Sequence, residues 1–288
     1  MEKTSVSVII PVFNEAENLG YVVQRIAALY PDFEIIVVND GSTDETASVA
    51  SDSGAIVYSH PYNIGNGAAI KSGIRIASGE ILVFMDGDGQ HDPEEIGALL
   101  SHFPDYDMAV GARGKGAHST WSRALGNKIY NRFASYVAKF QVMDLTSGFR
   151  AIKADMARNL LYLLPNTYSY PTTITLGVLR SGRSVKYVPI RARVRKTGKS
   201  KIKLLRDGVR FFMIIIKICA LYSPLRIFLP VSAVLFLTGL SYYLYTYILW
   251  GRFTNMSALL FTTSIVVFMI GLVSEQICQM RFERSEGK

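Results

Sequence analysis

Two long stretches without a charged residue constrain this chain most. Residues 227–251 and 254–274 contain no Asp, Glu, Lys or Arg, and each reaches the roughly 20 residues that a helix needs to cross a bilayer. Backbone groups in hydrocarbon must find their hydrogen bonds within their own segment, so both stretches should be helical. Only two residues, one of them Arg252, separate them. The sequence therefore predicts a two-helix transmembrane hairpin within 225–288, with spans of about 227–250 and 254–275 and a short cytoplasmic tail.

Positive charge gathers beside the predicted hairpin. The segment 191–226 carries eleven Lys and Arg against one acid, Asp207, although the whole chain has a net charge of only +8. More basic residues follow the second span, namely Arg281, Arg284 and Lys288. Cytoplasmic loops of membrane proteins carry such an excess of Lys and Arg. We therefore expect an integral protein of the cell membrane with both termini in the cytoplasm.

The segment directly before the hairpin, residues 201–224, interleaves basic residues with Phe, Met and Ile. This pattern predicts an amphipathic juxtamembrane helix on the inner membrane surface, where each Lys or Arg contributes about 1 kcal/mol toward an anionic leaflet. A third span is disfavoured, because Lys217 in hydrocarbon would cost about 2.5–3.5 kcal/mol on insertion scales. The charge adjoins a membrane span, so membrane lipid is the expected partner and nucleic acid is not.

Residues 1–200 alternate short apolar runs with helical patterns. Such alternation is typical of a parallel sheet covered by helices on both faces. The N-terminal apolar run is too short for a signal peptide, so this domain is expected in the cytosol. The expected fold class is α/β, with a Rossmann-like, mainly parallel sheet. Strands are predicted at Ser5–Pro11, Glu34–Val38, Ile56–Tyr58, Ile81–Met85, Met108–Gly111 and Val185–Ile190, and helices at about 16–29, 44–53, 66–78, 93–103, 121–140, 154–163 and 171–181.

The run Ile81–Gln90 places two carboxylates at a strand end. Five apolar residues predict a buried parallel strand, and Asp86, Asp88 and Gln90 follow it. Ligands of open α/β sheets bind outside the carboxyl ends of the strands. Mg²⁺ and Mn²⁺ prefer oxygen ligands, usually one or two carboxylates together with substrate phosphates. The run therefore predicts a site for a divalent cation, although Asp-Gly is also a common turn dipeptide.

Two other predicted strands also end in polar residues. Asn14 and Glu15 follow the first strand, and Asp40 follows the second. A glycine-bearing loop, residues 63–67, enters a later predicted helix. Each residue alone could be a helix cap or a turn residue. Their recurrence at three ends of one sheet favours a binding site at that edge.

Six motifs occur in an order that resembles a known family. They are Pro11-x-x-Asn14-Glu15, Asp40-Gly41-Ser42, Asp86-x-Asp88-x-Gln90-His91, Gly111-x-Arg113, Asp144-x-x-Ser147-Gly148-Phe149-Arg150 and Arg195-x-x-Gly198-x-Ser200-Lys201. Together they resemble family 2 glycosyltransferases of the polyprenyl-phosphate type, such as dolichyl-phosphate mannose synthase and undecaprenyl-phosphate glucosyltransferases. The resemblance covers about residues 5–203. It implies a GT-A fold for the cytoplasmic domain.

The resemblance implies transfer of a sugar from a nucleotide-diphosphate sugar, UDP-glucose-like or GDP-mannose-like, to a polyprenyl phosphate, with Mg²⁺ or Mn²⁺ as cofactor. The implied donor nucleotide-binding residues are Pro11, Phe13, Glu15, Asp40 and Asp86. The implied metal ligands are Asp86, Asp88 and Gln90. The implied acceptor phosphate-binding residues are Arg113, Arg123, Asn127, Arg195 and Lys201. The implied catalytic residues are Asp86, Asp88, Arg113, Arg123 and Arg195.

Three positions depart from the family pattern. Phe13 stands where Tyr is usual, Asn127 where Ser is common, and hydroxyl side chains in 168–175 replace an acid that often follows the Ser-Gly-Phe motif. These departures bear on the sugar and on the acceptor contacts. The four histidines do not cluster in the sequence; they are interpreted as structural or surface groups, and His91, beside Gln90, is the one with a candidate site role.

The chemistry of a phosphate acceptor predicts the reaction course. A phosphate monoester has a second pKa near 6 and is largely dianionic at neutral pH. It needs cationic positioning more than a general base, and the forked donors of arginine match its oxygens. Direct attack would invert the anomeric centre, without a glycosyl-enzyme intermediate.

Two other interpretations stay open at this point. A processive polysaccharide synthase would usually have more spans and a Gln-x-x-Arg-Trp motif, which the sequence lacks. A non-catalytic membrane-tethered lipid-binding protein would explain the basic segment but not the acids at three strand ends. Two spans per subunit leave much lipid-facing surface, which is compatible with a homo-oligomer.

Overall fold

A computed structural model of the chain describes residues 4–113, 131–132, 134–136, 139–167, 169–190 and 223–286. The chain divides into two compact units, Met1–Lys201 and Ile202–Lys288. Four of the predicted site residues lie outside the described ranges, as does nearly all of the predicted helix over 201–224. These four are Arg123, Asn127, Arg195 and Lys201.

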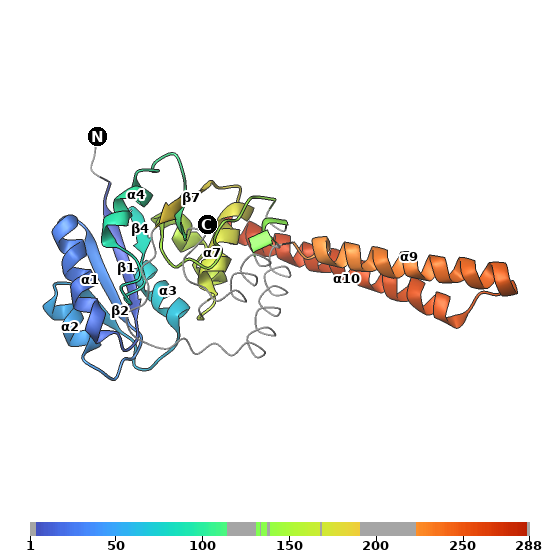
Figure 1. Ribbon diagram of the computed structural model, residues 1–288, viewed down its shortest axis with the longest axis horizontal. Coiled ribbons are helices and arrows are strands. Elements are labelled where there is room, and N and C mark those ends of the chain that lie inside the picture. Colours follow the sequence, from blue (N-terminus) through green and yellow to red (C-terminus); the bar gives the residue numbers. More distant parts are fainter. Residues whose placement is uncertain are drawn as a thin grey trace. The chain divides into compact units, whose positions relative to one another are not determined.

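The first unit is built on a seven-stranded sheet with the order β3-β2-β1-β4-β6-β5-β7 (Figure 1). Every strand except β6 runs in the same direction, because β6 is antiparallel to both of its neighbours while the other pairs are parallel. The predicted mainly parallel α/β sheet is confirmed. The strands are β1 (Val6–Val12), β2 (Glu34–Asn39), β3 (Ile56–Ser59), β4 (Ile81–Phe84), β5 (Met108–Arg113), β6 (Arg150–Lys153) and β7 (Val185–Ile190).

Helices cover both faces of this sheet, as the alternating pattern predicts. The α-helices of the unit are α1 (Ala16–Leu29), α2 (Thr46–Asp52), α3 (Asn66–Ile76), α4 (Ile96–Leu100), α6 (Ala154–Asn159) and α7 (Tyr170–Arg180). Residues of α1, α2 and α4 share one core cluster with alternate residues of β1. Residues of α3, α6 and α7 share a second cluster with Ile9 and Ile36. Successive strand residues point to opposite faces, so β1 contributes to both clusters and is buried throughout.

Strand β6 is the element that the sequence pattern did not predict. Its four residues, Arg-Ala-Ile-Lys, begin and end with a basic residue, and they lack the long apolar run of the central strands. Yet β6 lies between β4 and β5, and Arg150 is fully buried. The predicted helix at 93–103 is also shorter: a 3₁₀ turn over Pro93–Glu95 precedes α4. Its predicted cap is confirmed, because the Asp92 carboxylate accepts from the Glu94 N–H at 3.2 Å.

The second unit is a helical hairpin of α9 (Leu225–Trp250) and α10 (Asn255–Glu286). Both contain 26-residue segments that are long and apolar enough to cross a membrane, with mean hydropathies of 1.8 and 2.3. The second helix continues past the predicted end near 275. Gly251 ends α9 in the left-handed conformation, φ 60°, and its N–H donates to the Tyr247 carbonyl at 2.9 Å.

Small and polar residues hold the two helices together. The Ser232 hydroxyl donates to the Ser264 carbonyl at 2.9 Å, and the Ser264 hydroxyl donates back to the Ser232 carbonyl at 3.1 Å. A Cβ on Gly271 would lie 2.6 Å from the Phe228 Cβ, so only glycine allows this close approach. Hydroxyl pairs and small residues are the usual means of helix association in membranes.

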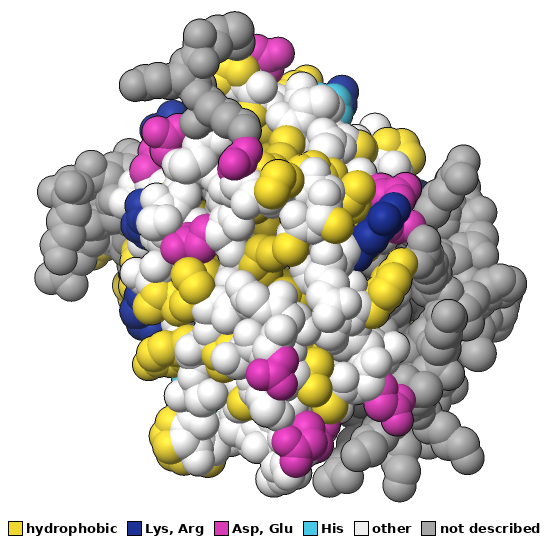
Figure 2. Space-filling model, turned by 90° about the vertical axis from the view of Figure 1, so that its left-hand side faces the viewer, with side chains coloured by type: hydrophobic (Ala, Val, Ile, Leu, Met, Phe, Trp, Pro, Cys, Tyr) yellow, Lys and Arg dark blue, Asp and Glu magenta, His cyan; other side chains and the backbone are white. Residues whose placement is uncertain are grey.

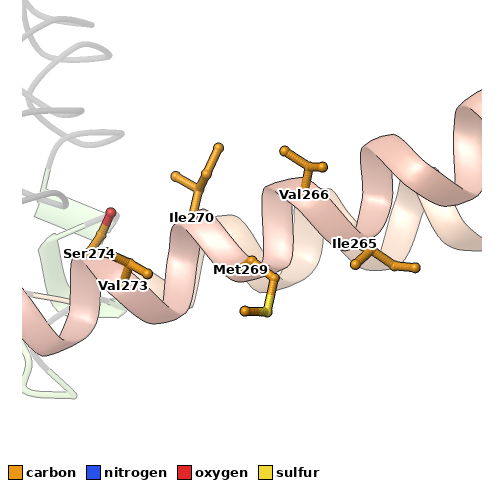
Figure 3. A pocket seen from close by; sticks show the side chains of 6 residues that line it. All are labelled: Ile265, Val266, Met269, Ile270, Val273 and Ser274. Carbon is orange, nitrogen blue, oxygen red and sulfur yellow. The ribbon is translucent and has the colours of Figure 1, made fainter.

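A hollow on α10 is lined by Ile265, Val266, Met269, Ile270, Val273 and Ser274 (Figure 3). Its lining side chains all come from one helix and include no charged group. This hollow therefore lacks the charged groups that bind phosphates. The candidate active site described below is on the first unit.

Candidate active site

Polar side chains from three parallel strands meet at one edge of the sheet. β1 pairs with β2 on one side and with β4 on the other, all in parallel. The chain therefore leaves all three strands at the same edge, toward Phe13, Asp40 and Asp86 respectively. Strand β5, which ends at Arg113, runs in the same direction as β4. The predicted convergence of strand ends is confirmed.

The turn after β4 supplies oxygen ligands. Asp86, Asp88 and Gln90 are all partly exposed, whereas Met85 and Gly87 are buried. The Asp88 carboxylate accepts from the backbone N–H of Gln90 at 3.1 Å, which keeps the two residues in one tight turn. Two carboxylates and an amide oxygen fit Mg²⁺ or Mn²⁺, which commonly takes its other ligands from substrate phosphates and water. Within the described ranges, no group of three His, Cys, Asp or Glu side chains is placed to hold a metal ion by itself.

Gly148 lies directly against Asp86. A Cβ at position 148 would be 2.7 Å from Asp86 Oδ2 and 3.2 Å from its Cγ. The Ser-Gly-Phe turn thus forms a wall of the carboxylate site, and any side chain there would displace Asp86. A second contact ties the same region together, because the His91 ring stacks on Phe149 with centroids 5.0 Å apart.

A fully buried arginine underlies this wall. The Arg150 guanidinium donates to the Pro171 carbonyl and to the Thr175 hydroxyl, both at 2.9 Å, and also to the Ser147 carbonyl. Burial lowers its pKa, and the nearby Tyr170, Tyr187, Asp144 and Asp86 act in the opposite direction. Arginine keeps its charge in proteins, so Arg150 places a fixed positive charge near Asp86 while fixing the turn to α7.

The loop after β1 is joined to the loop after β2. The Asn14 N–H donates to the Ser42 hydroxyl at 3.0 Å, and the Thr43 N–H donates to the Asn14 side-chain oxygen at 2.9 Å. Asn14 has a positive φ of 55°, a conformation that asparagine tolerates better than most residues. Phe13 stays 42% exposed beside this junction, while Pro11 is buried within β1 and Glu15 is partly buried.

Asp40 is 2% exposed and accepts hydrogen bonds from the chain itself. Its carboxylate takes the N–H groups of Ile64 at 2.9 Å and Gly65 at 2.8 Å. His60 Nδ1 lies 2.7 Å from the same carboxylate. His60 is 7% exposed, and this buried, hydrogen-bonded position agrees with the structural alternative of the predicted structural or surface role. A lone histidine gives no pattern from which such a contact could be found.

The described part of the chain contains all of the predicted donor-site and metal-site residues. For Arg113 the structure describes the backbone alone. Figure 2 shows one face of the molecule, on which acidic and basic side chains are scattered in small groups among apolar ones. Among the described residues on that face, the basic side chains form no continuous surface.

Residues 7–161 match the model of glycosyl transferase family 2, and residues 223–280 match the model of the GtrB C-terminal hairpin. The chain belongs to glycosyltransferase family 2. This glycosyltransferase is therefore an enzyme, as the motifs predict, and its hairpin is one that recurs in other proteins.

Several relatives of this glycosyltransferase carry names that describe lipid-phosphate substrates. The polyprenol monophosphomannose synthase of Mycolicibacterium smegmatis is 32% identical over 211 residues, which cover 68% of this chain and 80% of that protein. The undecaprenyl-phosphate mannosyltransferase of Micrococcus luteus is 30% identical over 208 residues, covering 67% and 86%. The undecaprenyl-phosphate 4-deoxy-4-formamido-L-arabinose transferase of Enterobacter sp. (strain 638) is 28% identical over 244 residues, covering 81% and 73%.

Solved structures support the GT-A fold of this glycosyltransferase. The glucosyl-3-phosphoglycerate synthase of Mycobacterium tuberculosis, crystallised with Mn²⁺ and UDP-glucose, aligns with a TM-score of 0.59 at 20% identity, covering 75% of this chain and 79% of that one. At this identity the likeness concerns the fold alone.

Proposed function

We propose that this glycosyltransferase transfers a sugar from a nucleotide-diphosphate sugar to a polyprenyl phosphate, in a reaction that requires Mg²⁺ or Mn²⁺ and inverts the anomeric centre. One observation carries the proposal: Asp86, Asp88 and Gln90 follow β4 at the edge where β1 and β2 also end, in a chain that carries a membrane-type hairpin. The names of the relatives support the acceptor class.

The donor half of the proposal rests on the charge that the reaction creates. Breaking the anomeric C–O bond leaves another negative charge on the departing diphosphate. Asp86, Asp88 and Gln90 would hold a divalent ion whose charge stabilises that diphosphate. Opposite unit charges 4 Å apart gain about 1 kcal/mol in water and about 4 kcal/mol at an effective dielectric of 20. A partly buried turn is therefore an effective place for such an ion.

The acceptor half rests on arginine. Arg113 ends β5 at the same edge, and we assign it to the acceptor phosphate, together with Arg123, Asn127, Arg195 and Lys201. A dianionic phosphate is already nucleophilic, so these residues orient it and no residue has to remove a proton from it. The hairpin would anchor the enzyme in the membrane, at whose surface the phosphate head group of a polyprenyl phosphate lies.

The test is transfer by the purified full-length enzyme in detergent or nanodiscs. UDP- and GDP-sugars are offered singly with undecaprenyl or dolichyl phosphate and Mg²⁺ or Mn²⁺. We expect one nucleotide sugar to give a lipid-extractable product, and EDTA to abolish its formation.

Proton NMR of that product reports the stereochemistry. An α-linked donor should give a β-linked lipid phosphate, because a single direct displacement inverts the anomeric centre. Retention of the α configuration, or a sugar trapped covalently on any carboxylate of the enzyme, would contradict the inverting course.

A further inference from the structure

Asp40, His60 and Ser72 form a chain of hydrogen bonds beside the strand-end edge. His60 Nδ1 lies 2.7 Å from Asp40 Oδ1, and His60 Nε2 lies 2.9 Å from the Ser72 hydroxyl. The His60 backbone N–H also donates to the Asn39 carbonyl at 2.8 Å. The two bonds of the imidazole ring connect Asp40, at the end of β2, to Ser72 in α3. The imidazole itself is buried.

The hydrogen bonds of Asp40 support the loop between β3 and α3. Asp40 accepts from the N–H groups of Ile64 and Gly65, so its carboxylate uses three of roughly four acceptor positions within the protein. The loop also rests on Gly41, since a Cβ there would lie 2.4 Å from the Tyr62 carbonyl carbon. The geometry of residues 62–65 therefore depends on how Asp40 is oriented.

This loop presents apolar side chains at the site edge. Tyr62 is 67% and Ile64 is 36% exposed, and Phe13, which follows the neighbouring strand β1, is 42% exposed. Exposed aromatic and aliphatic groups beside a polar strand end suit the flat face of a heteroaromatic base. On its other side the loop meets the segment before α7, because a Cβ on Gly65 would lie 2.3 Å from the Asn166 carbonyl oxygen.

We propose that His60 is a positioning residue for the donor's nucleoside: it orients Asp40, and Asp40 in turn holds the loop of residues 62–65 in the shape that receives the base. The inference rests on the proposed function, since it assumes a nucleotide donor. An acid, an imidazole and a hydroxyl in this order also occur in nucleophilic triads. Here the imidazole is buried, and the Asp40 carboxylate accepts hydrogen bonds from two N–H groups of the loop. The three residues therefore support the loop and do not form a nucleophile.

The inference predicts a selective defect in donor binding. His60→Leu should weaken the binding of UDP or GDP, whichever the wild-type enzyme prefers, by at least about tenfold, because Asp40 loses a charge-assisted partner. His60→Asn should restore part of the affinity, since its amide can still donate to Asp40. Ser72→Ala, which removes only the outer bond, should lie within about threefold of wild type.

Titration calorimetry with the free nucleoside diphosphates gives the affinities, and steady-state kinetics give KM and kcat. KM for the donor should rise while KM for polyprenyl phosphate and kcat stay within about twofold. The matched control is His102→Asn, a histidine whose ring contacts Tyr106 and which should behave as wild type. Thermal unfolding of each variant shows whether it is folded. If His60→Leu does not fold, the affinity of His60→Asn still tests the inference.

The outcomes separate the two proposals. Tight binding by wild type together with equally tight binding by a folded His60→Leu or His60→Asn variant overturns the positioning role alone. Equal losses in donor affinity, acceptor affinity and kcat also overturn it, because they indicate a general structural role. A wild-type enzyme that binds no nucleoside diphosphate overturns the proposed function and this inference with it.

Discussion

Replacing Asp88 by asparagine should lower sugar transfer at least about 10³-fold, because in the proposed function Asp88 is a charged ligand of the ion that stabilises the leaving diphosphate. The asparagine side chain has nearly the same size, so the fold should survive. Asp88 is partly exposed, and its hydrogen bond from the Gln90 N–H can be accepted equally well by an amide oxygen. The loss should therefore appear in metal binding as well as in catalysis.

Two measurements separate these effects. Transfer to polyprenyl phosphate gives the rate, and Mn²⁺ electron paramagnetic resonance in the presence of UDP or GDP gives the metal affinity, which should fall at least about tenfold. The matched control is Asp105→Asn, the same change at an exposed position before β5, which should leave both values as in wild type. Normal sugar transfer by Asp88→Asn would show that Asp88 is not a metal ligand of the active site.

Adding one methyl group at Gly148 should cost at least about 100-fold in transfer, since displacement of a reacting group by about 1 Å can have an effect of this size. The new Cβ would lie 2.7 Å from Asp86 Oδ2. The glycine cannot easily retreat, because Arg150 binds the Ser147 carbonyl and fixes the turn to α7. Asp86 should therefore be the group that moves.

Gly20→Ala on α1 is the matched control for Gly148→Ala. Its new Cβ would approach two side-chain atoms, Val49 Cγ1 at 3.2 Å and the Ser53 hydroxyl at 3.5 Å, and no backbone atom. Alanine also favours a helix more than glycine does. It should keep wild-type activity. If Gly148→Ala kept full transfer and unchanged Mn²⁺ affinity, the Ser-Gly-Phe turn would not be a wall of the metal site.

The sequence predicted those parts of the fold that have a clear hydrophobic period. Buried runs such as Ile81–Phe84 and the uncharged stretch at 227–251 leave little choice of structure. β6 was missed because Arg150 opens it, and a charged residue in a four-residue segment is ordinarily read as a loop. The burial of Arg150 is tolerable because carbonyl and hydroxyl groups accept its hydrogen bonds, and two of these acceptors, Pro171 and Thr175, come from α7 later in the chain.

The site was predictable to the same limited extent. Strand ends place Asp40 and Asp86 at one edge, and parallel pairing alone explains that result. The bonds between His60, Asp40 and Ser72 could not be predicted, because they depend on how the end of β2, the end of β3 and helix α3 approach one another. The close contact of Gly148 with Asp86 is likewise a property of the folded sheet: the two residues are 62 positions apart in the sequence but adjacent in space.

The most direct test of the central claim offers two acceptors in competition. The full-length enzyme receives its preferred radiolabelled nucleotide sugar, Mn²⁺, a polyprenyl phosphate and an equal concentration of a soluble phosphate monoester such as phosphoglyceric acid. We predict that the label enters the lipid-extractable phase, and that Asp88→Asn or EDTA prevents this transfer. Label that appears only in a water-soluble product, or that reaches lipid equally well without a divalent cation, would contradict a metal-dependent donor site serving a lipid phosphate.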